Sequence, residues 1–165
     1  VLKDYQKQRI IGVFDPTYDP LGVNYSTIQS KIAVGSGGWF GKGFGQGTQV
    51  QLGFLPEAGT DYIFSSITEE WGLFGGLFVL ILLGVMLLRI IRIGFYAESN
   101  FYRFVCLGAT VMFLAQVTIN VGSALGIFPV IGITFPFLSY GGSSLLINAM
   151  LLGIIHSVSV YRSLS

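Results

Sequence analysis

The sequence predicts an all-α integral membrane protein, on three observations. Of the 165 residues, 52% are hydrophobic and only 10% are charged, whereas soluble domains carry about 25% charged residues. The mean hydropathy is +0.71. Three stretches of the chain are apolar over the roughly 20 residues that a helix needs to cross a bilayer. Because backbone groups in lipid must bond within their own segment, each stretch is expected to be a helix.

The three predicted spans cover residues of about 71–88, 104–128 and 138–161. Between the first two spans, residues 89–103 carry three arginines against a single acid, Glu98. The loop at 129–137 has no charge. Because short cytoplasmic loops are rich in Lys and Arg, we expect residues 89–103 and the C-terminus to lie in the cytoplasm and residues 1–70 to lie outside.

Residues 1–70 are predicted to form an ordered extracytoplasmic loop with short helices. In NYSTIQSKIAV, Asn24 can cap a short helix with Ile28 and Ile32 on one face. The stretch GSGGWFGKGFGQG has seven glycines in thirteen residues. It fits neither nucleotide-binding pattern, because its Gly-Lys pair is followed by glycine and its GxGxxG match ends in phenylalanine. We expect these glycines to allow tight turns or close approach to a ligand, with a flexible linker as the alternative.

Composition excludes several classes of function. A net charge of +1 gives no reason to expect nucleic acid as a partner. The single cysteine, Cys106, excludes a disulfide framework and a Cys/His metal cluster. The single histidine, His156, is predicted on the cytoplasmic side, so no Ser/His/Asp triad can form outside. The N-terminus has neither Met nor the order of a signal peptide, so we expect the C-terminal part of a longer membrane protein.

The stretch FLPEAGTDYIF places Asp61 among apolar and aromatic neighbours shortly before the first span. A short helix is expected to begin near Tyr62, which would put Asp61 at its N-cap, a role worth about 0.5–2 kcal/mol. The alternative role is a catalytic base at the membrane surface. The helix dipole would favour the ionised carboxylate, whereas partial burial would raise its pKa. The pattern alone leaves both roles open.

The run from Asn120, NVGSALGIFPVIGITFPFLSYGGSS, resembles the signature of the SEDS family, which comprises the RodA, FtsW and SpoVE proteins. The residues that match the signature are Asn120, Gly126, Pro129, Gly132, Ser139, Tyr140, Gly141, Gly142, Ser143 and Ser144. Upstream, YQKQRI, FDPTYDPLG, IQSKIAVGSGG, GKGFGQGTQ, FLPE and TDYIF are similar to the same family, so the resemblance covers essentially the whole chain. The DPLG, IQS and GTQ segments look more like RodA, of cell elongation, than like FtsW, of division.

The resemblance implies a ten-helix protein of the bacterial cytoplasmic membrane, of which this chain would supply the outer loop between helices seven and eight and then helices eight to ten. It implies a peptidoglycan glycosyltransferase that polymerises lipid II, the undecaprenyl-diphosphate-linked disaccharide-pentapeptide, and works with a class B penicillin-binding protein. The family's catalytic carboxylate is the Asp of a TDFIF motif, which corresponds to Asp61 in TDYIF. The departures at Tyr62 and at Ser65-Ser66 leave the acid in place. Without the first seven helices, this segment alone is expected to be inactive.

Two cations are weaker candidates for binding the diphosphate: Lys42 in the glycine-rich stretch and Arg9 in YQKQRI. Attraction to anionic lipid headgroups is the alternative for both. Asn120, Gln116 and Asn148 are interpreted as residues that hydrogen-bond between helices. No cofactor is evident and no metal-ligand spacing occurs, although a divalent cation stays open. Two other functions also stay open: a lipid II flippase, and a non-catalytic scaffold for a class B penicillin-binding protein.

Overall fold

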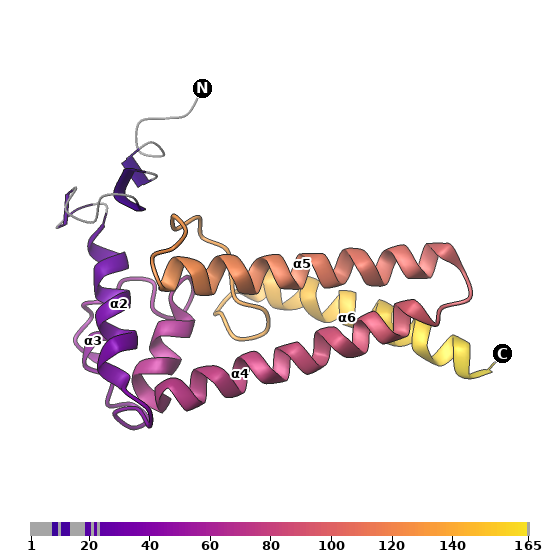
Figure 1. Cartoon of the computed structure of the whole chain (residues 1–165), viewed down its shortest axis with the longest axis horizontal. Coiled ribbons are helices and arrows are strands. Elements are labelled where there is room, and N and C mark those ends of the chain that lie inside the picture. The colour runs from indigo at the N-terminus through magenta and orange to yellow at the C-terminus, as the bar shows by residue number, and fades with distance from the viewer. Residues whose placement is uncertain (1–7, 10, 14–18, 21, 23, 165) are drawn as a thin grey trace.

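A computed structural model describes residues 8–9, 11–13, 19–20, 22 and 24–164. Its helices are α2 (Tyr25–Gly37), α3 (Thr48–Gln51), α4 (Ile63–Phe95), α5 (Asn100–Ala124) and α6 (Gly142–Leu164). Figure 1 shows α4, α5 and α6 running lengthwise together, with α2 and α3 at one end. Each of the three long helices is long and apolar enough to cross a membrane. The prediction of an all-α membrane fold is therefore confirmed.

Two clusters of buried side chains join the long helices. Phe113 of α5 is fully buried and packs with Ile90 of α4 and Ile155 of α6. Near the start of α4, Phe64 stacks on Phe135, with 6.4 Å between the ring centroids. Large apolar side chains stay exposed along most of α4, which suits a helix that is surrounded by lipid.

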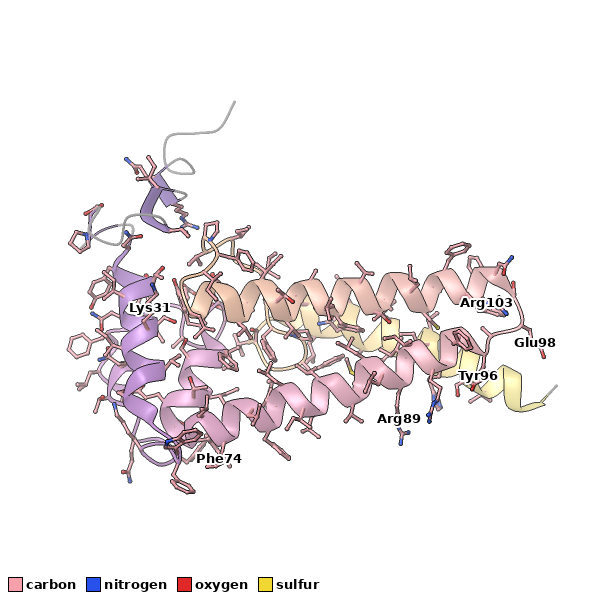
Figure 2. The ribbon with its side chains drawn as sticks, in the orientation of Figure 1. Lys31, Phe74, Arg89, Tyr96, Glu98 and Arg103 are labelled. Atoms are coloured by element: carbon pink, nitrogen blue, oxygen red, sulfur yellow. The ribbon has the colours of Figure 1, made fainter. Side chains whose placement is uncertain are left out.

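Charged side chains gather at the two ends of the long helices. Figure 2 shows Lys31 at the end where α2 lies, and Arg89 and Glu98 toward the other end. Between the ends, residues 71–88 of α4 and 104–124 of α5 contain no charge. The region before α4 and the Arg-rich loop therefore lie at opposite ends of the bundle. Which end faces the cytoplasm stays a prediction.

The first predicted span is part of a longer helix. α4 begins at Ile63 instead of near residue 71, because the short helix expected before the span continues into it. The one interruption is at Gly72, whose backbone (φ 73°, ψ −175°) is not helical. At its other end α4 continues to Phe95, through the arginines that follow the apolar run.

The other two spans are also bounded by loop contacts. α5 ends at Ala124 instead of near residue 128, because Gly126 adopts the left-handed conformation (φ 68°). The N–H groups of Gly126 and Ile127 bond back to the carbonyls of Ser123 (3.0 Å) and Gly122 (2.7 Å), which is the Schellman pattern of a helix end. α6 begins at Gly142 instead of near residue 138, because the preceding residues form a hydrogen-bonded turn.

Small residues, not the predicted isoleucine face, bury α2 against α4. Asn24 precedes α2 as predicted, but its side chain makes no capping hydrogen bond. Ile32 is 45% exposed, whereas Ser30 is fully buried. Ser30 Oγ lies 2.6 Å from Ser65 Oγ of α4, and a Cβ added at Gly37 would collide with a backbone oxygen of α4. Bulky side chains on this face would prevent the two helices from approaching so closely.

The glycine-rich stretch, residues 35–47, closes over the break in α4, and we call it the glycine clasp. Four backbone hydrogen bonds join the two: Lys42 N–H to Glu69 O (3.0 Å), Gly43 N–H to Glu70 O (3.0 Å), Leu73 N–H to Gly38 O (2.9 Å) and Phe74 N–H to Trp39 O (3.2 Å). A Cβ added at Gly41 would collide with Glu70 O. The glycines make tight turns, as predicted, but they approach the backbone of α4 and do not form a flexible linker.

Candidate active site

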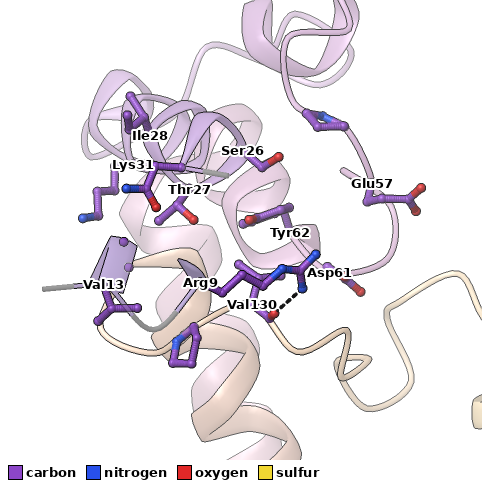
Figure 3. Close-up of a pocket in the computed structure, with 15 residues that line it drawn as sticks. Arg9, Val13, Ser26, Thr27, Ile28, Lys31, Glu57, Asp61, Tyr62 and Val130 are labelled. Carbon is purple, nitrogen blue, oxygen red and sulfur yellow. Dashed lines mark hydrogen bonds between the residues drawn. The ribbon is translucent and has the colours of Figure 1, made fainter. Parts of the chain in front are cut away.

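A cavity of about 160 Å³ lies where α2, the turn before α4 and the loop after α5 meet (Figure 3). Its polar and charged lining residues are Arg9, Asn24, Ser26, Thr27, Lys31, Glu57, Asp61 and Tyr62. The cavity therefore places two carboxylates and two cations around one space. Such a wall can hold an anionic ligand beside a carboxylate.

Asp61 does not cap α4, so the capping role, one of the two that the sequence leaves open, is wrong. The N-cap residue is Tyr62, and no side chain bonds to the start of the helix. Instead, the N–H groups of Thr60, Asp61 and Tyr62 all donate to the carbonyl of Glu57, at 3.1, 3.1 and 3.3 Å. Within residues 57–62, which we call the Asp61 turn, the Glu57 carbonyl thus satisfies three N–H groups. Among the described residues, neither oxygen of the Asp61 carboxylate accepts a hydrogen bond.

The surroundings of Asp61 raise the pKa of its carboxyl group. Partial burial is the largest cause, and the negative charge of Glu57 adds to it, while the positive charge of Arg9 lowers the pKa. A carboxylate with a raised pKa accepts a proton more readily. Burial likewise raises the pKa of the neighbouring Tyr62 hydroxyl, which therefore stays protonated at neutral pH.

Arg9 and Lys31 face this cavity from different elements. Arg9 Nη1 donates to the carbonyl of Val130 at 2.6 Å, and Figure 3 shows its guanidinium group beside Asp61. Lys31 extends from α2, and a Cβ added at Gly126 would collide with its side chain. Arg9 is a predicted site residue. Lys31 is not, although its spacing of four residues from Thr27 places both on one face of α2.

Lys42, the other predicted cation, does not line the cavity. Its Nζ forms an ion pair of 2.7 Å with Oε1 of Glu69 and donates to Thr48 Oγ1 at 2.7 Å. The Glu69 side chain has no exposed surface and also accepts from the N–H groups of Gln49 (3.0 Å) and Val50 (3.4 Å). These contacts fasten the glycine clasp and α3 to α4.

Three of the predicted signature residues bond to the backbone that carries Asp61. The contacts are Tyr140 N–H to Gly59 O (2.8 Å), Ser139 Oγ to Thr60 O (2.6 Å) and Asn120 Nδ2 to Asp61 O (3.1 Å). Asn120 was interpreted as a residue that bonds between helices, and it joins α5 to two loops. For Gln116 and Asn148, the side-chain oxygens are buried without a partner in the described part of the chain.

The remaining signature residues lie in the loop after α5 and at the start of α6. Gly126 and Pro129 line the cavity. Gly132 lies beside Asp61, because a Cβ added there would be 3.6 Å from Asp61 Oδ2. The residues at the start of α6 are Gly141, Gly142, Ser143 and Ser144, and none of them lines the cavity. Their observed contact is local: Ser144 Oγ donates to the carbonyl of Gly141 at 2.9 Å.

Within the described ranges, no group of three or more His, Cys, Asp or Glu side chains could hold a metal ion. Glu57 and Asp61 are the carboxylates on the described wall of the cavity. A divalent cation bound there would take most of its oxygen ligands from the substrate or from water.

Comparison with known protein families identifies the family of the chain that carries this site. The family model of the FtsW, RodA and SpoVE proteins, described as "Cell cycle protein", matches residues 1–164. The chain belongs to the FtsW/RodA/SpoVE family. The resemblance to the SEDS proteins is thereby confirmed.

Curated members of the FtsW/RodA/SpoVE family are similar to nearly the whole chain. The peptidoglycan glycosyltransferase MrdB of Escherichia coli K12 is 43% identical over 164 residues, 99% of this chain and 44% of the relative. Stage V sporulation protein E of Bacillus subtilis is 46% identical over 157 residues, 95% of this chain and 43% of the relative. The peptidoglycan glycosyltransferase RodA of Treponema pallidum is 41% identical over 159 residues, 96% of this chain and 37% of the relative. The chain spans less than half the length of these relatives.

A solved structure has the same fold over this part of the FtsW/RodA/SpoVE architecture. It is described as "Structural coordination of polymerization and crosslinking by a peptidoglycan synthase complex". The match has a TM-score of 0.74 at 31% identity and covers 98% of this chain and 43% of that chain. With its three apolar helices, the chain is part of a multi-pass membrane protein.

Proposed function

We propose that this chain is part of a peptidoglycan glycosyltransferase that polymerises lipid II, and that Asp61 is its general base. The observation that carries the proposal is the cavity, which is lined by a half-buried carboxylate with a raised pKa and by the cations Arg9 and Lys31. The names of MrdB of Escherichia coli and RodA of Treponema pallidum, both peptidoglycan glycosyltransferases, support this class of reaction.

The position of Asp61 along the chain suits a lipid-linked substrate. It stands two residues before Ile63, where α4 begins. A polyprenyl tail that stays in the bilayer holds its sugar head group at the interface, so the base that acts on this sugar must lie there too. The positive-inside rule predicts that this end of the helices lies on the outer face of the bacterial cytoplasmic membrane.

The proposed reaction is an inverting displacement. Asp61 accepts the proton of the 4-hydroxyl group of the acceptor sugar, and the oxygen attacks C1 of the donor sugar. A new C1–O bond forms as the bond from C1 to the lipid diphosphate breaks, and the diphosphate leaves with the bonding electrons. Since diphosphate is a good leaving group, a second carboxylate that protonates it is not required, in contrast to the glycosidase design.

The two cations of the cavity are suited to the charge of the leaving group. Positive groups that are already in place where negative charge develops lower the barrier to reaction. Arg9 is held by Val130 O, and no partner of the Lys31 ammonium group is found in the described part of the chain. Lys31 therefore replaces Lys42 as the second candidate for the diphosphate.

The partner and the cellular role are proposed on the same basis. The matched structure is described as a complex for polymerization and crosslinking, which supports a class B penicillin-binding protein as the partner that crosslinks the new strands. The similarity to MrdB and RodA supports a role in cell elongation.

The test is Asp61→Asn in the whole protein, reconstituted with its transpeptidase partner and supplied with labelled lipid II. Loss of a general base should slow glycan formation by about 10²–10⁴-fold. Glu98→Gln makes the same chemical change at the opposite end of the helices and should keep the normal rate. A separate assay follows translocation of the lipid II head group, because a flippase would keep translocating it. Glycan chains that form at the normal rate in Asp61→Asn would remove the assignment of the base.

A further inference from the structure

The backbone of the Asp61 turn is held from outside at three successive carbonyls. Gly59 O accepts from Tyr140 N–H at 2.8 Å, Thr60 O from Ser139 Oγ at 2.6 Å, and Asp61 O from Asn120 Nδ2 at 3.1 Å. All three donors come from the segment between the second half of α5 and the start of α6. Three N–H groups of the same turn, those of Thr60, Asp61 and Tyr62, already donate to Glu57 O. The turn is therefore bonded on both its donor and its acceptor side.

The carboxylate of Asp61 has no comparable support of its own. Among the described residues it accepts no hydrogen bond. The location of its oxygens therefore depends on where the backbone of the turn is held. A displacement of about 1 Å at a reacting group can reduce the rate about 10²-fold, so contacts that fix this backbone bear directly on catalysis.

The two side chains among these donors have chemistry suited to the task. Ser139 is 6% exposed; its hydroxyl accepts from Phe135 N–H at 2.8 Å and therefore directs its own proton to Thr60 O. Asn120 is 1% exposed, and its Nδ2 donates to Asp61 O and to Ile133 O at 2.9 Å. Both partners of Nδ2 are carbonyls, which identifies it as the nitrogen.

These bonds also hold the loop that lies beside the carboxylate. Asn120 and Ser139 join the Asp61 turn to Ile133 and Phe135. Gly132, next to Ile133 in the chain, lies beside Asp61 Oδ2. The same contacts thus set the width of the space between the carboxylate and the loop.

We propose that Ser139 and Asn120 are positioning residues for Asp61, which hold the base in place through the carbonyls of its turn. The inference rests on the proposed function, because it assigns these residues a role in the placement of the base. It predicts that loss of either contact lowers kcat with little change in KM, because neither side chain lines the cavity.

The experiment compares Ser139→Ala with Ser123→Ala in the whole protein with its transpeptidase partner. Ser123 is a matched control, since it is also buried, but its hydroxyl bonds to carbonyls of its own helix at 2.9 Å. With labelled lipid II, Ser139→Ala should lower kcat by about 10–100-fold and leave KM near the wild-type value. In Ser139→Ala, the acid limb of the profile of kcat/KM against pH should also move to lower pH. A carboxylate that is no longer held in place gains contact with water, and so loses the burial that is the main cause of its raised pKa. Ser123→Ala should change neither kcat nor the pH profile.

The outcomes separate this inference from the proposed function. If Ser139→Ala behaves like Ser123→Ala while Asp61→Asn stops polymerisation, the base stands and the positioning role is overturned. If Asp61→Asn polymerises normally, the proposed function and the positioning role both fail. A variant that only yields less folded protein would have a lower rate at every pH, with the acid limb of the profile unmoved. A shift of that limb therefore supports the positioning role. Should Ser139→Ala not fold, Ser139→Cys weakens the bond to Thr60 O instead of removing it, because a thiol is a poor donor. Wild-type kcat and an unshifted pH profile in that variant would overturn the role.

Discussion

Gly72 stands where the backbone of α4 leaves the helical conformation at the start of the predicted apolar run. Its backbone (φ 73°, ψ −175°) lies in a region that is essentially restricted to glycine, and a residue with a Cβ adopts it at a cost of about 1–3 kcal/mol. A Cβ added at Gly72 would also collide with Trp39 O of the glycine clasp. Neither the strain nor the collision can be relieved by a side-chain rotation, because both involve backbone. Gly72→Ala must therefore displace the clasp or distort α4.

The magnitude follows from the bonds that join the two segments. Displacing the clasp weakens the four backbone hydrogen bonds between it and the break, each of which contributes about 1 kcal/mol. If half to all of that contribution is lost, the sum with the backbone strain is about 3–7 kcal/mol. A loss of this size is large for a single substitution. We expect a clear fall in melting temperature.

The assay is thermal unfolding of the whole protein in detergent, followed by loss of helical circular dichroism. Gly84→Ala is the control in the same helix, because a Cβ added at Gly84 meets no atom within 4 Å. Since Gly84 has helical geometry, alanine there should stabilise the helix by up to about 1 kcal/mol. A Gly72→Ala variant that melts at or above the temperature of Gly84→Ala would refute the account of the clasp.

Two further predictions concern charge. Glu57→Gln removes a negative neighbour and should lower the pKa of Asp61, so that the acid limb of kcat/KM moves to lower pH, whereas Arg9→Gln should move it to higher pH. Profiles of lipid II polymerisation against pH measure both, and shifts in the same direction would contradict the causes assigned. Glu69→Gln leaves a partly buried ammonium group without its ionic partner and should cost about 3 kcal/mol. Thermal unfolding beside the exposed Glu98→Gln checks this, and equal melting temperatures would contradict it.

The fold class could be predicted because lipid leaves few choices to an apolar stretch. A run that is long enough to cross the bilayer must form a helix whatever its detailed sequence. The ends of the helices could not be predicted in the same way. α4 continues to Phe95 past Arg89 and Arg92, since hydropathy marks the end of the apolar run and not the end of the helix. α5 stops where Gly126 turns left-handed, and hydropathy does not show that turn.

Only part of the candidate site could be predicted, because a sequence motif identifies a residue but does not show which other segments pack around it. Asp61 was singled out by its motif and its place before a span, and it lies in the cavity. Of the two roles left open for Asp61, that of a cap was wrong, because a carbonyl four residues earlier, that of Glu57, organises the turn. Among the outer cations, the sequence pattern favoured Lys42 over Lys31. Only the packing of α2 on α4 shows that Lys31 faces the cavity and that Lys42 pairs with Glu69.

The glycine clasp explains how a break can stand at the start of a span. In lipid, each backbone N–H or carbonyl without a partner costs several kcal/mol, so a helix that breaks there needs partners from another segment. The clasp supplies donors to Glu69 and Glu70 and acceptors to the N–H groups after Gly72. The stretch of α4 before Gly72 is thereby bonded to α2 and the clasp, while the rest of α4 packs with α5 and α6. The direction in which α4 leaves the Asp61 turn is therefore set by the loop that precedes the turn, and not by the tilt of the span that follows.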